Sequence, residues 1–62
     1  MAQVAIYTAT GEVLIVEERS SLKIVQMARW FREAKADDVL SYESEDGVVY
    51  VQKRHIVRLV TP

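Results

Sequence analysis

Both glycines of the chain stand between two β-prone runs, and this arrangement constrains the fold more than any other feature of the sequence. Gly11 divides residues 3–18, and Gly47 divides residues 39–53. Glycine supplies the positive φ that a tight turn requires, and the pair formed by Asp46 with the second glycine suits a two-residue hairpin turn. The sequence therefore predicts two antiparallel hairpins, one at each end of the chain.

The first hairpin is predicted to be apolar on both faces. If Thr10 and Gly11 form a two-residue loop, residues directly opposite each other across the strands share a face. One face then carries Val4, Ile6, Val13 and Ile15, and the opposite face carries Ala5, Tyr7, Leu14 and Val16. An antiparallel sheet with one wet face alternates apolar and polar residues. The first hairpin lacks that alternation, so something is expected to cover each of its faces.

Between the two hairpins the apolar period changes to that of a helix. Apolar residues recur at three- and four-residue steps, at Ile24, Met27, Ala28, Phe31 and Ala34. A hydroxyl of Ser20 or Ser21 can cap the first turn, and the helix is expected to end near Ala36. Trp30 lies at the edge of the apolar stripe. Its indole is therefore either part of the core or an exposed anchor for a partner.

The second hairpin is predicted to have one wet face. Its pairing places Leu40, Tyr42, Val49 and Val51 on one side, and Ser41, Glu43, Tyr50 and Gln52 on the other. Residues 56–60 form another β-prone run that can return along the sheet as an edge strand. We therefore expect residues 1–62 to form a single α+β domain of order ββαββ. It would be an antiparallel sheet with one helix packed on one face, and residues 56–60 are a candidate fifth strand.

The small size of the chain makes the second apolar face of the first hairpin important. A chain of 62 residues without cysteine has a small core and no disulfide or thiolate zinc site to stabilise it. We expect the face formed by Ala5, Tyr7, Leu14 and Val16 to pack against another copy of the chain, in a homodimer or larger closed oligomer. The alternative is that Ile56, Val57, Leu59 and Val60 fold back over that face within one chain.

The sequence contains no recognisable catalytic, metal or cofactor constellation. His55 is the only histidine and has no acidic neighbour in sequence to orient it as a base. The acidic tip formed by Glu43, Glu45 and Asp46 lacks the ligand spacing of a calcium loop. No glycine-rich loop suited to phosphate follows a strand and opens a helix. We therefore predict that the protein is not an enzyme and that it uses no metal ion or cofactor.

A candidate surface for a macromolecular partner combines basic and aromatic residues. Trp, Tyr and Arg dominate the energetic centres of protein interfaces. The same residues also suit nucleic acid, since Lys and Arg contact phosphates and Tyr50 can stack on an unpaired base. The net charge of −1 and the pI near 5.7 provide no global attraction to polyanions. The candidate residues are Arg29, Trp30, Arg32, Tyr50, Lys53, Arg54 and Arg58.

The leading functional hypothesis is a non-catalytic interaction or regulatory module that associates with itself and binds another macromolecule, in the first place a protein. The alternative is a small nucleic-acid-binding or transcription-associated protein that uses a local basic patch. No stretch approaches the roughly 20 apolar residues that span a bilayer, and no basic segment leads into an apolar run at the start. We therefore expect a cytoplasmic protein without a membrane partner.

Overall fold

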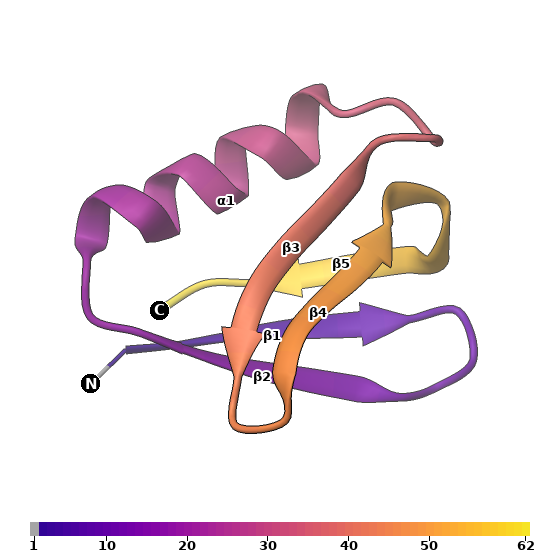
Figure 1. Ribbon diagram of the computed structural model, residues 1–62. Helices are drawn as coiled ribbons and strands as arrows, with labels where there is room; N and C mark the ends of the chain where they lie inside the picture. The colour runs from indigo at the N-terminus through magenta and orange to yellow at the C-terminus, as the bar shows by residue number, and fades with distance from the viewer. Residues whose placement is uncertain (1) are drawn as a thin grey trace.

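The computed structural model describes residues 2–62 and confirms the α+β class (Figure 1). The order of elements is ββαβββ, so residues 56–60 do form a fifth strand. The elements are β1 (Ala2–Thr8), β2 (Val13–Glu18), α1 (Ser21–Glu33), β3 (Val39–Ser44), β4 (Gly47–Gln52), the short 3₁₀ segment η1 (Lys53–His55) and β5 (Ile56–Val60).

The five strands are divided between two antiparallel sheets. One sheet has the order β2-β1-β5, and the second consists of β3 and β4 alone. In Figure 1 the β3–β4 hairpin crosses one face of the larger sheet, and α1 lies beside that hairpin. The helix therefore shares the inner side of the larger sheet with the second hairpin.

The core lies between the two sheets. Val4 and Ile6 of β1 are completely buried, and the cluster around them includes residues of both sheets. The helix contributes half-buried side chains to the edge of this cluster, and none of its residues is fully buried. These are Ile24, Met27, Trp30 and Phe31. Trp30, whose position the sequence leaves open, thus lies at the border between core and surface.

The register of the first hairpin differs by one residue from the prediction. Tyr7 is opposite Val13 and Val4 is opposite Val16. A three-residue loop replaces the predicted two-residue loop: the Gly11 N–H donates to the Thr8 carbonyl at 3.1 Å, and the Thr8 N–H donates to the Glu12 carbonyl at 2.9 Å.

The reason for this longer loop lies in the backbone conformation. A two-residue hairpin loop requires positive φ at its first central residue, which is unfavourable for the β-branched Thr10. In the observed loop Gly11 alone takes a positive φ, 89°, as in a type I turn followed by a left-handed residue.

The one-residue difference transfers every side chain of β2 to the other face. Leu14 and Val16 are packed inside with Val4 and Ile6, whereas Val13 and Ile15 lie outside. The predicted self-association set of Ala5, Tyr7, Leu14 and Val16 therefore does not share one face. The outer face carries Ala5 and Tyr7 from that set, together with Val13 and Ile15.

The faces of the second hairpin are as predicted. Leu40 is opposite Val51 on the core side, and Ser41 is opposite Tyr50 on the outer side. The chain reverses at residues 45–46, with Gly47 at a φ of 119° as the first residue of β4. The turn is expected at residues 46–47, and its observed place moves the pairing of the two strands by two residues. Because side chains alternate along a strand, a shift of two leaves every side chain on its predicted face.

The last strand lies beside β1 rather than over it. Leu59 is opposite Ile6, and Val60 is opposite Ala5, so β5 extends the larger sheet by one edge strand. Ile56 enters the core, while Val57 and Val60 stay exposed. The alternative in which residues 56–60 cover the second face of the first hairpin is therefore wrong. β5 enlarges that face instead.

Candidate interaction surfaces

The first candidate surface is the outer face of the β2-β1-β5 sheet, which we call the outer face. It consists of Ala5, Tyr7, Val13, Ile15, Arg58 and Val60, which are neighbours in the observed register. Val13, Ile15 and Val60 are 44%, 51% and 43% exposed, respectively. Because the hairpin and the helix lie on the inner side, these apolar side chains of β2 and β5 remain in water.

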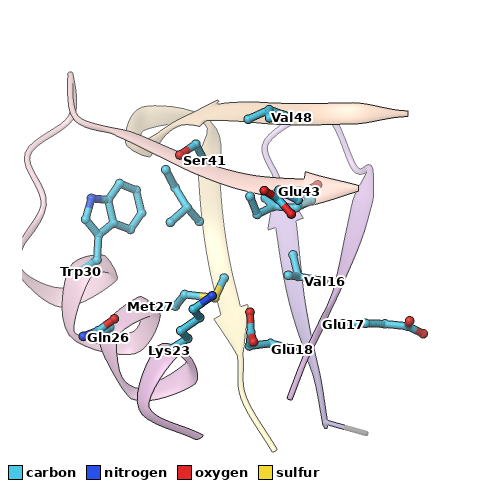
Figure 2. A pocket seen from close by; sticks show the side chains of 12 residues that line it. Val16, Glu17, Glu18, Lys23, Gln26, Met27, Trp30, Ser41, Glu43 and Val48 are labelled. Atoms are coloured by element: carbon cyan, nitrogen blue, oxygen red, sulfur yellow. The ribbon is translucent and has the colours of Figure 1, made fainter. Parts of the chain in front are cut away.

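The second candidate surface is a groove between α1, the end of β2 and β3. Its volume is about 850 Å³. Figure 2 shows Lys23, Met27 and Trp30 of the helix on one side and Val16 and Glu18 on the other. A smaller hollow of about 640 Å³ shares Glu17 and Glu43 with the groove and reaches the tip of the second hairpin. We call the two together the β2–β3 groove.

Unpaired strand edges border the β2–β3 groove. β2 pairs only with β1, and β3 pairs only with β4, within residues 2–62. The groove thus separates two sheet edges whose outward backbone groups have no partner strand. Exposed edges of this kind are templates for pairing with another chain.

Tyr42 lines the β2–β3 groove from the core side of β3. Burial raises the pKa of its phenol above the ordinary value of 10.0, and the carboxylate of Glu12 raises that pKa further. Tyr42 therefore carries a neutral hydroxyl at any physiological pH.

The basic residues of the predicted partner surface are distributed over several parts of the molecule. The ammonium of Lys53 lies 4.3 Å from the centroid of the Phe31 ring, and the guanidinium of Arg58 lies 4.1 Å from that of Tyr7. Arg54 forms an ion pair with Asp37. The three charges are therefore engaged with groups of their own chain.

The other predicted partner residues also lie on different surfaces. Arg29 and Arg32 are exposed on α1, and Tyr50 is exposed on the outer side of the second hairpin. Trp30 lines the β2–β3 groove. In the structure Trp30 therefore lies beside other groove residues, which were not among the partner residues predicted from the sequence.

The charged residues among these are mainly acidic. Glu17 and Glu18 come from the end of β2, and Glu43, Glu45 and Asp46 come from the second hairpin. Sequence reasoning assigned the hairpin carboxylates to a solvated tip, and they are indeed exposed. The signal that could have revealed the groove is the presence of two acidic runs, but only the tertiary structure brings them to one place.

The remaining residues considered for chemistry in the sequence are His55 and the acidic side chains. His55 is exposed, and its carbonyl accepts a hydrogen bond from the Ala9 N–H at 2.8 Å. Over residues 2–62, no three His, Cys, Asp or Glu side chains are grouped so that they could hold a metal ion. No helix in this range has the length and apolar character needed to cross a bilayer.

Comparisons with protein-family models, with curated proteins and with solved structures find no match to this chain.

Proposed function

We propose that the protein is a non-catalytic interaction module that associates with itself through the outer face and binds another protein. The observation that carries self-association is the exposure of Val13 and Ile15 on β2 and of Val60 on β5, the two strands that flank β1. Burying a large apolar side chain contributes about 1.5–3 kcal/mol relative to leaving it in water. A chain of this size has a net stability of only a few kcal/mol from its own core. Covering the outer face would therefore add substantially to stability.

A second copy is the simplest cover for the outer face. The same patch on two chains can meet across a two-fold axis, which is the commonest symmetry of soluble oligomers. Two antiparallel sheets pack face to face about 10 Å apart with interdigitating apolar side chains. The guanidinium of Arg58 lies over the ring of Tyr7 on the central strand, and the other side chains of the outer face are uncharged.

Sedimentation velocity with matched variants tests this association. Ile15 and Val39 are each 51% exposed, but Val39 lies outside the outer face, on β3. Ile15→Lys is expected to convert the oligomer into a monomer of 7.1 kDa, whereas Val39→Lys should leave the oligomer intact. A wild-type protein that sediments as a monomer at every accessible concentration would overturn self-association.

Binding to another protein is tested by affinity recovery of the tagged chain from its host's lysate, with and without nuclease. A protein partner that survives nuclease supports the proposal. Nucleic acid is the alternative partner, and it is the weaker candidate because Lys53, Arg54 and Arg58 are already engaged with Phe31, Asp37 and Tyr7. Recovery of nucleic acid, with binding that falls steeply as salt rises, would reverse this ranking.

A further inference from the structure

We propose that the β2–β3 groove binds an extended, basic segment of a partner protein, which adds to the open edge of β3 as a further β-strand. This inference rests on the proposed role in protein binding and does not depend on self-association. The main part of the groove lies beside α1 and β3 (Figure 2), and the groove borders the outer face at Ile15.

The open edge of β3 presents free backbone groups to the groove. The Lys53 N–H donates to the Asp38 carbonyl at 2.8 Å, at the start of the β3–β4 ladder. Hydrogen-bonded pairs alternate along an antiparallel ladder, so the backbone groups of Val39, Ser41 and Glu43 point away from β4. Ser41 and Glu43 line the groove. An added strand would pair with these groups, as in other recognition by strand addition.

The groove also offers an apolar wall for alternate side chains of such a strand. Met27 and Trp30 are half-buried on α1 and line the groove opposite β3. Successive residues of a strand point to opposite sides, so every second residue of the added segment would face this wall. The polarizable thioether and the indole suit aliphatic side chains of varied shape.

The charge of the groove selects a basic partner. Its carboxylates belong to Glu17, Glu18, Glu43, Glu45 and Asp46, whereas Lys23 is the one cationic residue that lines it. Glu18 accepts hydrogen bonds from the N–H groups of Arg19 and Ser20. The carboxylates of Glu17 and Glu43 form no ion pair within residues 2–62. They are therefore free to attract Lys or Arg side chains of the added segment.

The same charges argue against a second copy as the occupant. A copy that entered through its own β2 or β3 edge would bring Glu17 or Glu43 against identical carboxylates. Like charges placed together at an interface are unfavourable. A basic segment has no such penalty.

The fluorescence of Trp30 provides the test, because this groove residue is the only tryptophan. The probe is a peptide of alternating lysine and valine, about eight residues long, which matches the length of a typical strand. We expect saturable binding that changes the Trp30 emission and weakens with salt. A peptide of alternating glutamate and valine should not bind. Equal binding of both peptides, or no change with either, would overturn the proposal.

Two double variants with the same change in net charge distinguish binding in the groove from attraction to the charge of the whole protein. Glu43→Lys combined with Glu45→Lys is expected to weaken binding of the lysine peptide about tenfold or more. The control combines Glu12→Lys with Glu33→Lys, which changes the net charge equally at exposed positions outside the groove. If the control weakens binding as much as the groove variant, the groove is not the site.

Two further measurements test whether the peptide pairs with the backbone of β3. N-methylation of alternate amides on the pairing edge of the peptide removes its donors and should abolish binding. Amide hydrogen exchange of Val39, Ser41 and Glu43 is expected to slow when the unmodified peptide binds. Slowing at the β2 edge instead, or binding that tolerates methylation on either edge, contradicts addition to β3.

The outcomes remain distinct from those of the proposed function. A monomeric wild type that binds the lysine peptide would overturn self-association and leave the groove proposal standing. A protein partner recovered from lysate, combined with no peptide binding, would leave the interaction role standing and overturn the groove. A groove variant that loses oligomerisation, with no peptide binding, would identify a second copy as the occupant.

Discussion

The guanidinium of Arg58 lies over the ring of Tyr7, 4.1 Å from its centroid, and the two residues are directly opposite each other in the β1–β5 ladder. This contact joins the last strand to the first on the outer face of the sheet. An exposed cation–π pair of this kind contributes about 0.5–1 kcal/mol.

Replacement of Arg58 by alanine should therefore lower the free energy of unfolding by about 0.5–1 kcal/mol. Urea denaturation measures the change. Arg29→Ala, at an exposed position on α1, is the matched control and should change stability much less. If both variants lose the same stability, the Tyr7 contact contributes nothing specific.

Ile6 and Ile15 provide a direct test of the register in the first hairpin. The expected two-residue loop makes them partners on one face, whereas the structure buries Ile6 completely and leaves Ile15 on the outer face. Ile6→Ala should lower the free energy of unfolding by about 2–5 kcal/mol, enough to unfold much of so small a protein. Ile15→Ala should have a much smaller effect in dilute, monomeric samples. Similar losses at the two positions would contradict the observed register.

Ser20 and Ser21 are adjacent hydroxyls, and only one of them caps α1. The Ser20 Oγ accepts a hydrogen bond from the Lys23 N–H at 3.3 Å, which identifies Ser20 as the N-cap. Ser20→Ala should cost about 1 kcal/mol of stability, and Ser21→Ala should be nearly neutral because Ser21 is already inside the helix. Thermal unfolding of the two variants followed by circular dichroism distinguishes them, and a larger loss for Ser21→Ala would show that the cap is wrongly assigned.

Tyr42 makes stability depend on pH in the alkaline range. Its pKa in the folded state is raised, first by burial and then by Glu12. The folded state therefore holds the phenolic proton more tightly than the unfolded state, whose pKa is near 10. This contribution is fully present below pH 10 and is lost as the pH rises through the folded-state pKa.

The variant Tyr42→Phe should remove that part of the alkaline destabilisation. Denaturation curves at a series of pH values from 8 upward should show a smaller decline for the variant than for the wild type. Tyr50→Phe, on the exposed side of the second hairpin, is the control and should keep the wild-type profile. Parallel profiles for wild type and Tyr42→Phe would contradict the assignment.

The sequence by itself determined the elements whose patterns are local. The three- and four-residue steps from Ile24 to Phe31 specify the helix, and the contrast between Leu40 and Ser41 specifies the faces of the second hairpin. In that hairpin a register shift of two residues changes no face, so the pattern is robust to the choice of turn. The β-prone composition of residues 56–60 was likewise sufficient to predict a strand.

The tertiary structure alone decided the register of the first hairpin, the place of β5 and the β2–β3 groove. Both faces of the first hairpin are apolar, so its hydrophobic pattern cannot distinguish two registers that differ by one residue. The loop closed by Thr8 and Glu12 makes that choice. The groove brings Glu17, Trp30 and Glu43 together from three different elements, β2, α1 and β3. Local periodicity describes the face of one element, whereas a shared surface depends on how the elements pack.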